Sequence, residues 1–422
     1  MKTKCGGKIL LLVGLVIYKI LLDVVYNYVI SINYEYLGYI NHATRSSYIV
    51  SWLVFLFFLP LIVSFYNRKD NQGLFTNIII LLFIVRFIPT TSLMAFMPMP
   101  FKMFILYILY WLLIYVASCI IRPIHVRINT SLCFPKVLYL LMGVLIVTVL
   151  YVSGRYTGFR FTLDLNTIYD LRMEARTWNI PLIISYLLPA SITVLPVLLM
   201  YFWYKKDRII VAILMFVILF NFSINGMKSI LFYLIVCFWG YYFYDNKKKY
   251  IYHWILISVI LIVLSEYIIS HTCLFGVVVA RGLFLPAKLD YHYFDFFQTH
   301  ECDYFRQSFL RWFDNSVYDT EIARLIGYKY YGNIEMNANN GLFSDAYKNL
   351  GIWGIFIFPF IIVTLFKLLN SCAKNLDPKL LILPIFISVT WFSSVSFSNV
   401  LLTNGLLLMM FVLCCLPRGV MK

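Results

Sequence analysis

The chain has 422 residues, of which 62% are hydrophobic and only 13% are charged, and its formal net charge is +16. An ordinary soluble protein carries about 25% charged residues, so this composition excludes a soluble domain and indicates an integral membrane protein. The positive charge alone would also fit nucleic-acid binding, but the basic residues are divided among short connections between apolar segments, so no nucleic-acid partner is expected.

About twelve apolar segments approach the roughly 20 residues that are needed to cross a membrane. We expect spans near residues 9–29, 48–66, 74–95, 101–121, 137–153, 181–204, 209–225, 228–244, 251–270, 349–370, 380–398 and 401–416. Because lipid offers no partner to backbone N–H and C=O groups, these segments should be helices. The sequence therefore predicts an all-α polytopic membrane protein that forms a single integral membrane domain over residues 1–422.

Every second connection between these spans is short and basic, from the N-terminal cluster at Lys2 to the C-terminal one at Lys422. This distribution follows the rule that cytoplasmic loops are enriched in Lys and Arg. It predicts that both termini are cytoplasmic and that residues 154–180 and 271–348 are external. The longer external segment lies between spans nine and ten and holds nine of the 19 acidic residues. We expect it to act as a lid over a site.

Asp23, Arg86 and Glu266 are the notable charged residues inside the predicted spans. Charged groups are costly within a membrane, so they commonly have a function. These three form no regular file along the spans, which is a poor match to a proton or ion relay.

The shorter external segment contains "IYDLRMEAR", in which Arg172 and Arg176 are spaced i, i+4 and share one face of a predicted helix. Two guanidinium groups on one face suit a phosphate or pyrophosphate group. The alternative is a pair of ordinary helix charges paired with Asp170 and Glu174. Lys228, in "NGMKS" at the outer end of a span, either adds a third cation to that anionic site or extends to the membrane surface.

The stretch "RGLFLPAKLDYHYFDFF" begins at Arg281 in the longer external segment. A single cation beside apolar chain suits a lipid phosphate. The aromatic rings that follow offer flat faces for sugars, and the carboxylates between them offer acceptors for hydroxyl groups. The candidate substrate-binding or catalytic residues of this stretch are Asp290, Tyr291, His292, Tyr293 and Asp295. An aromatic belt at the membrane interface is the alternative, but a belt does not need interleaved carboxylates.

Two further patterns follow in the same segment. "YDTEIARLIGYKYYG", residues 318–332, has apolar residues at helical spacing and ends at a glycine, so it predicts a helix. Gly351 and Gly354 would let the tenth span pack closely on a neighbouring helix. Asp345 lies about one turn before that span, where it is within reach of a site at the membrane surface or acts as a charge at a helix N-terminus.

Five stretches follow one another within residues 150–360, namely "IYDLRMEA", "PLIISYLLP", "NGMKSILF", "RGLFLPAKLDYHYFDFF" and "NGLFSDAYKNLGIWGIFIFP". In this order they resemble bacterial oligosaccharide repeat-unit polymerases, the Wzy-type polymerases of O-antigen and capsular polysaccharide. The patterns R-x-L-F-x-P-A, Y-x-D-F-F and F-S-D-A-Y-x-N-L-G-x-x-G are the most specific parts. The first third of the chain matches in hydropathy alone.

The resemblance implies a metal-independent membrane glycosyltransferase without a cofactor, in the bacterial cytoplasmic (inner) membrane. Its donor and acceptor would be undecaprenyl-pyrophosphate-linked glycans, used at the outer face of the bilayer. A chain-length regulator and a flippase of the same pathway are the implied protein partners. The arginines on which family members depend fall on Arg172, Arg176 and Arg281 here.

The chemistry of this reaction agrees with the residue types. Preplaced cations stabilise the negative charge that develops on a leaving pyrophosphate. The attacking hydroxyl needs a base within hydrogen-bond reach, for which His292, Asp290 and Asp345 are equal candidates. The nearest alternative is an O-antigen ligase, which transfers the glycan to lipid A core. A lipid-linked oligosaccharide flippase fits less well, because it should have charged spans and short loops.

Overall fold

The computed structural model describes residues 2–68, 73–126, 134–164, 167–243, 251–269, 277–311 and 313–418. Within these ranges the chain forms helices and no strand. The prediction of an all-helical protein is therefore confirmed for the described part of the chain. Residues 271–276, at the start of the longer predicted external segment, lie outside it.

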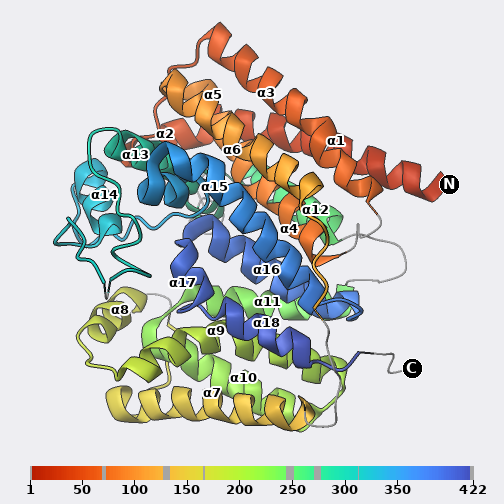
Figure 1. Cartoon of the computed structure of the whole chain (residues 1–422), viewed down its shortest axis with the longest axis vertical. Helices are drawn as coiled ribbons and strands as arrows, with labels where there is room; N and C mark the ends of the chain where they lie inside the picture. The colour runs from red at the N-terminus through yellow and green to blue at the C-terminus, as the bar shows by residue number, and fades with distance from the viewer. Residues whose placement is uncertain are drawn as a thin grey trace. The chain divides into compact units, whose positions relative to one another are not determined.

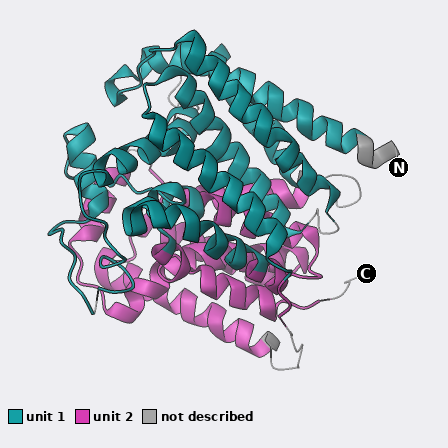
Figure 2. Ribbon diagram, turned by 45° about the horizontal axis from the view of Figure 1, so that its top comes forward, with its two compact units in different colours: residues 1–123, 249–367, 391–397 teal, residues 124–248, 368–390, 398–422 magenta. Residues whose placement is uncertain are grey.

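The chain forms two compact units, each built from segments that are far apart in the sequence (Figure 2). Unit 1 comprises residues 1–123, 249–367 and 391–397, and unit 2 comprises residues 124–248, 368–390 and 398–422.

Unit 1 contains the N-terminal spans and most of the longer predicted external segment. Its elements are α1 (Lys2–Val25), η1 (Tyr26–Ile30), α2 (Ser31–Asn33), η2 (Glu35–Leu37), α3 (Arg45–Ser64), η3 (Phe65–Asn67), α4 (Leu74–Leu82), η4 (Phe83–Phe87), α5 (Ile88–Phe96), α6 (Phe101–Ile120), α12 (Ile251–Ile268), η5 (Val277–Phe284), α13 (Leu285–Phe297), α14 (Ile322–Tyr331) and most of α15 (Phe343–Cys372). Helix α1 packs against α12, and α3 packs against α5 (Figure 1).

Unit 2 is a second helical bundle in which α9 and α10 pack on each other and on α7. Its elements are α7 (Phe134–Thr157), α8 (Ile168–Arg176), α9 (Leu182–Tyr204), α10 (Arg208–Asn225), α11 (Lys228–Phe243) and α18 (Leu406–Cys415). Helices α16 (Pro378–Ser394) and α17 (Phe397–Leu401) contribute residues to both units.

Ten helices in the described residues are long enough and apolar enough to cross a membrane. They coincide with ten of the twelve predicted segments. The remaining two, expected near residues 228–244 and 380–398, form shorter apolar helices, Lys228–Tyr242 and Pro378–Ser394. The chain is a polytopic membrane protein, and the number of twelve spans stays a prediction.

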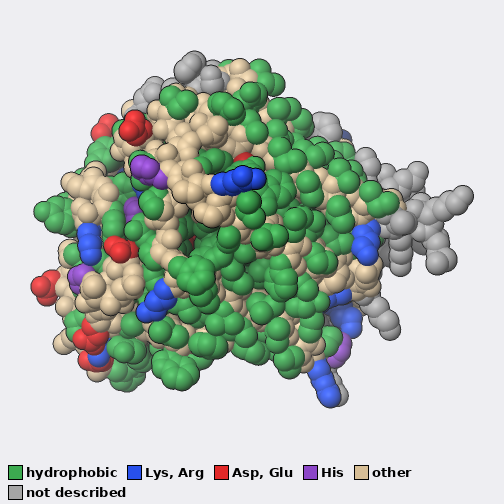
Figure 3. Space-filling model, turned by 90° about the horizontal axis from the view of Figure 1, so that it is seen from above, with side chains coloured by type: hydrophobic (Ala, Val, Ile, Leu, Met, Phe, Trp, Pro, Cys, Tyr) green, Lys and Arg blue, Asp and Glu red, His purple; other side chains and the backbone are tan. Residues whose placement is uncertain are grey.

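Large apolar side chains are exposed on these helices, as at Leu140 on α7 and Ile183 on α9, which are 70% and 73% exposed. A continuous apolar surface of this kind is unfavourable in water and suits contact with lipid. Figure 3 shows hydrophobic side chains over most of one face of the molecule, whereas most of the acidic side chains visible there lie towards its left edge.

Hydrogen bonds join connections and helix ends of unit 1 at two places, one near the start of α3 and one near its end. Where α3 begins, the hydroxyl of Tyr39 donates to the carbonyl oxygen of Ala280 at 2.8 Å. Where α3 ends, Arg68 donates to the hydroxyl of Ser118 at 2.8 Å, and Lys367 donates to the carbonyl oxygen of Ser118 at 2.9 Å. The bond at the first place joins connections predicted to be external, and the bonds at the second join helix ends that flank predicted basic connections.

Helix α15 is broken at Gly351, whose φ of 56° and ψ of −134° are not helical. A Cβ atom at Gly354 would lie 1.9 Å from the carbonyl oxygen of Ala346, in the preceding part of the same helix. The two glycines therefore allow the break and the close approach of the two halves of α15. The prediction that they pack this span on a neighbouring helix was wrong in this respect.

Gly354→Ala should destabilise the protein, because the added methyl group would overlap the carbonyl of Ala346. We expect a loss of roughly 1–3 kcal/mol in the free energy of unfolding, measured by thermal unfolding of the purified chain in detergent micelles. Gly143→Ala on α7 is the control, because no atom lies within 4 Å of its Cβ position. Equal unfolding temperatures for the two variants would contradict the break in α15.

Candidate functional site

The candidate residues of the stretch that begins at Arg281 divide between two faces of helix α13. At 3.6 residues per turn, Asp290 and Tyr293 lie on the side opposite Lys288 and His292. The first side, here the bundle face, is directed towards η4 and α5, whereas the second, here the α14 face, is directed towards α14. The α14 face consists of Lys288, Tyr291, His292 and Asp295.

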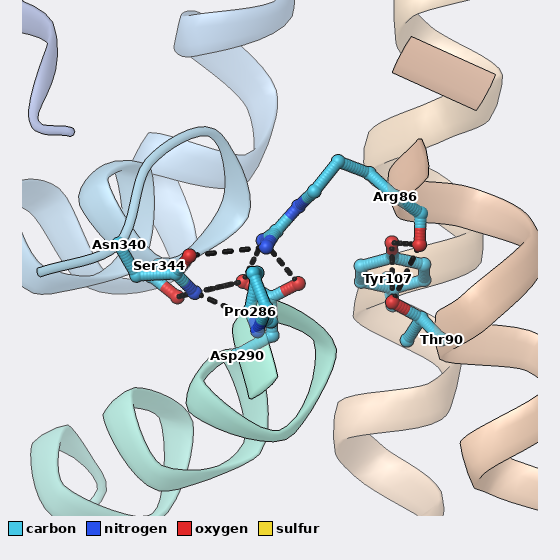
Figure 4. Close-up of polar contacts among 7 residues, drawn as sticks. All are labelled: Arg86, Thr90, Tyr107, Pro286, Asp290, Asn340 and Ser344. Carbon is cyan, nitrogen blue, oxygen red and sulfur yellow. Dashed lines mark hydrogen bonds and ion pairs between the residues drawn. The ribbon is translucent and has the colours of Figure 1, made fainter. Parts of the chain in front are cut away.

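On the bundle face, Asp290 forms an ion pair with Arg86 of η4 (Figure 4). Nη2 of Arg86 lies 2.8 and 2.7 Å from the two carboxylate oxygens, and its Nη1 donates to Oδ1 of Asn340 at 3.0 Å. Asn340 and Ser344 each donate to Oδ1 of Asp290, at 3.0 and 2.6 Å. All four side chains are at most 3% exposed. The four residues thus form a buried polar cluster that joins α13 to η4 and to the start of α15.

The cluster limits what Asp290 can do chemically. Burial raises the pKa of its carboxyl group to about 6, while Arg86 and Ser344 act in the opposite direction. Its oxygens already accept from three side chains, so an attacking hydroxyl would have to displace a protein donor. These contacts favour a structural role for Asp290 over the predicted catalytic one.

Tyr293 and Asp345 are also occupied by protein partners. Tyr293 is 3% exposed and its hydroxyl donates to the carbonyl oxygen of Ala338 at 3.1 Å, so its ring offers no face to a sugar. Asp345 lies in the first turn of α15 and accepts from the N–H of Phe397 at 2.7 Å and from Asn349 at 3.0 Å. It is 2% exposed, which fits its alternative role as a charge at a helix N-terminus.

The α14 face brings the remaining candidates together. The predicted helix within residues 318–332 is confirmed as α14, and the ring of its Tyr330 stacks on His292 with 4.1 Å between centroids. The hydroxyl of Tyr330 donates to Oδ2 of Asp295 at 2.5 Å. Tyr291 is half-buried, and burial raises the pKa of its phenol. Aromatic rings and a carboxylate therefore do alternate on one surface, as the sequence predicts.

His292 is the candidate base whose ring keeps a nitrogen atom without a protein partner among the described residues. It is 5% exposed, and its Nδ1 has no hydrogen-bond partner in the described part of the chain. Burial, and secondarily the charge of Lys288, lowers the pKa of its imidazole to about 3. The ring is therefore neutral at pH 7 and can accept a proton when a negative charge is bound nearby, since such a charge raises the pKa of an imidazole.

Arg281 lies on η5, just before α13, and is exposed. Tyr39 connects it to the α14 face: the hydroxyl of Tyr39 is bonded to Ala280, and its ring lies 5.1 Å from Nζ of Lys288. Burial raises the pKa of Tyr39, and the charge of Arg281 acts in the opposite direction. Lys288 thus lies against the ring of Tyr39, and Arg281 follows the residue that the Tyr39 hydroxyl contacts.

Unit 2 holds the other three predicted cations. Arg172 and Arg176 lie on α8, as predicted, and the charge of Arg176 adds to the effect of burial in lowering the pKa of Arg172. Arg172 donates to the carbonyl oxygen of Gly226 at 3.4 Å, two residues before the exposed Lys228. Glu174 pairs with Arg160. The prediction that these cations share one site with Arg281 would join the two units, and it stays a prediction.

Sequence reasoning did not find the partners of these residues. Arg86 stood out as an intramembrane charge, but its pairing with Asp290 has no local signal, because the two are 204 positions apart. Lys288 could have been found from its i, i+4 spacing to His292 on one helix face. Among the described residues, no group of three or more His, Cys, Asp or Glu side chains could hold a metal ion.

Removing one partner of the Arg86–Asp290 pair should be far more harmful than removing both. Arg86→Met leaves a buried carboxylate without its cation, for which we expect a loss of about 3–5 kcal/mol in the free energy of unfolding. Arg86→Met with Asp290→Leu should regain much of that loss in thermal unfolding. Arg160→Ala is the control, because its pair with Glu174 is 37% exposed on both sides and such pairs contribute about 0–1 kcal/mol. An additive double variant would contradict the pairing.

The chain was compared with models of known protein families, with curated proteins and with solved structures, and none of these comparisons gave a match.

Proposed function

We propose that the protein polymerises undecaprenyl-pyrophosphate-linked oligosaccharide repeat units into O-antigen or capsular polysaccharide at the outer face of the cytoplasmic membrane. One observation carries the proposal: exposed Arg281 lies on η5, which leads directly into α13, and one face of α13 gathers aromatic rings, an imidazole and a carboxylate. The resemblance over residues 150–360 supports the choice of substrate.

The reaction is a glycosyl transfer. A hydroxyl group at the non-reducing end of the incoming unit attacks the anomeric carbon of the growing chain, and the bond from that carbon to the pyrophosphate oxygen breaks. The proton of the hydroxyl passes to a base, and undecaprenyl pyrophosphate leaves. Arg281 stabilises the charge that develops on the leaving group.

The contacts within unit 1 favour different roles for the candidate residues. His292 is the preferred base, because its Nδ1 has no partner among the residues that the structure describes, whereas the oxygens of Asp290 and Asp345 accept hydrogen bonds. Tyr291 and Asp295 contact the sugars, and Asp290, Tyr293 and Asp345 support the site. Arg172, Arg176 and Lys228 bind anionic substrate groups from unit 2. A chain-length regulator and a flippase act with the protein in the same pathway.

The same geometry serves an O-antigen ligase, which uses the same donor and differs in its acceptor. A flippase is less favoured, because two intramembrane cations, Lys19 and Arg86, are held in buried ion pairs. Lys19, for example, donates to Asp23 at 2.7 Å and to Ser51 and Ser92 at 3.1 Å, so its ammonium group has no remaining donor.

The surface glycan of a strain that lacks this gene separates the three functions. A polymerase deletion should leave a single repeat unit on the lipid A core in a gel of the surface glycan. A ligase deletion should leave no glycan on the core, and a flippase deletion should abolish all exported lipid-linked material. Either of the last two patterns would overturn the proposal.

Arg281→Ala should abolish polymer at normal protein levels, because an exposed arginine that has no hydrogen bond or ion pair with the described residues contributes little to folding. Loss of one transition-state contact lowers such rates by about 10²–10³-fold. Arg281→Lys should restore part of the activity, since the charge remains and the bidentate geometry is lost. Arg324→Ala is the control, as Arg324 pairs with Glu321 in the same segment. Full polymer from Arg281→Ala would remove Arg281 from the site.

A further inference from the structure

Lys288 is a buried cation without a carboxylate partner. Its side chain is 4% exposed, and Nζ donates to the carbonyl oxygen of Leu37. No ion pair of Lys288 occurs in the described part of the chain, and the carboxylate on the same face, Asp295, is bonded to Tyr330. One carbonyl and two aromatic rings offset only part of the cost of burying an ammonium group.

The space around this ammonium group is specifically formed by the chain. Gly38 has a φ of 75°, and a Cβ atom there would lie 2.6 Å from Nζ of Lys288. A side chain at this position would require the ammonium group to move from its place. The rings of Tyr39 and Tyr331 lie on it with centroids 5.1 and 5.3 Å from Nζ.

Two other polar groups beside Lys288 lack partners within the described residues. They are Nδ1 of His292 and the hydroxyl of Tyr331, both shielded from solvent. The rings of these two residues are 5.4 Å apart, so the ammonium group, the imidazole and the phenol surround one small region. Buried polar atoms are rarely left unsatisfied, and such a group of them indicates a missing ligand. The positive charge of Lys288 in this region favours an anion as that ligand.

We propose that Lys288 is a second phosphate-binding cation of the donor site, and that a pyrophosphate oxygen takes the place of the Tyr331 ring beside its ammonium group. This inference rests on the proposed function and deepens it. Tyr331 is the last residue of α14 and is half-exposed, so its ring can turn outward without disturbing the helix. Its hydroxyl, which lacks a partner in the closed position, then reaches water.

The binding of farnesyl pyrophosphate to the full-length protein in detergent micelles tests this inference. Lys288→Met should weaken binding by about tenfold or more, as expected for a lost charge-assisted hydrogen bond. Lys329→Met is the matched control: Lys329 also lies over aromatic rings, 4.9 Å from the centroid of Phe296, but it is exposed. The control should bind as the unaltered chain does. Equal affinity of Lys288→Met and the unaltered chain would overturn the inference.

Tyr331→Ala separates a ligand site from a merely structural lysine. If the ring competes with the anion, its removal should tighten binding, roughly two- to fivefold for one lost cation–π contact. If Tyr331→Ala instead weakens the binding of farnesyl pyrophosphate, the ring supports the fold and does not compete with the anion. That outcome counts against the proposal even if the Lys288→Met variant does not fold.

Two comparison ligands identify the chemistry. Farnesol, which lacks the pyrophosphate, should not bind through Lys288. Dioleoyl phosphatidylglycerol should compete poorly, and equal competition would mean that the site binds lipid headgroups in general, against the donor assignment.

The polymerase proposal can fail separately from this inference. Lys288-dependent binding by a chain that makes no polymer would refute the polymerase and keep the anion site. Polymerisation that is unaffected by Lys288→Met would refute the role of Lys288 and keep the polymerase.

Discussion

The buried ion pair between Arg86 and Asp290 is the constraint on which the arrangement of unit 1 depends. An isolated charge in such surroundings is unfavourable by several kcal/mol, so each partner requires the other to be in place. Because successive residues of a helix turn by about 100°, directing Asp290 towards Arg86 also directs Lys288 and His292 towards α14. Arg86 itself lies in a π-helical turn, a geometry that is often found at functional sites. One interaction therefore determines which side chains of α13 can meet a substrate.

The longer predicted external segment is joined to unit 1 at a second place, the break in α15. The N–H groups of Asp303 and Tyr304 donate to the carbonyl oxygens of Lys348 and Asn349 at 3.0 and 3.1 Å, which satisfies acceptors that the broken helix leaves free. Together with the contacts of Asn340 to Asp290, this bonding makes much of the segment part of the wall of the bundle. A lid that moves freely as one body would have to break these contacts.

Hydropathy predicts most of this fold, because a membrane requires long apolar helices and tolerates little else. The helix that became α14 was also predictable, from its apolar spacing and its terminal glycine. The two faces of α13 were not predicted, because the sequence analysis assigns no helix to the stretch that begins at Arg281 and contains Pro286. Asp290 and Tyr293 are of the same residue types as Asp295 and Tyr291. Only their position around the helix distinguishes the two residues that support the site from the two that are proposed to contact the sugars. The partner of Asp290 lies in a distant span, and its approach depends on tertiary packing that no local pattern encodes.

The proposed reaction uses two lipid-linked glycans, and each of them carries a pyrophosphate. The chain carries two groups of cations in two different units: Arg281 on η5 and Lys288 on α13 in unit 1, and Arg172, Arg176 and Lys228 along α8 and the start of α11 in unit 2. With Lys288 included, unit 1 offers two cations to the leaving pyrophosphate without help from unit 2. The cations of unit 2 are then available to hold the acceptor, whose pyrophosphate does not react and needs binding but no transition-state stabilisation. A division of this kind would give a use to each of these five cations, which lie in or next to predicted external segments where topology alone favours none.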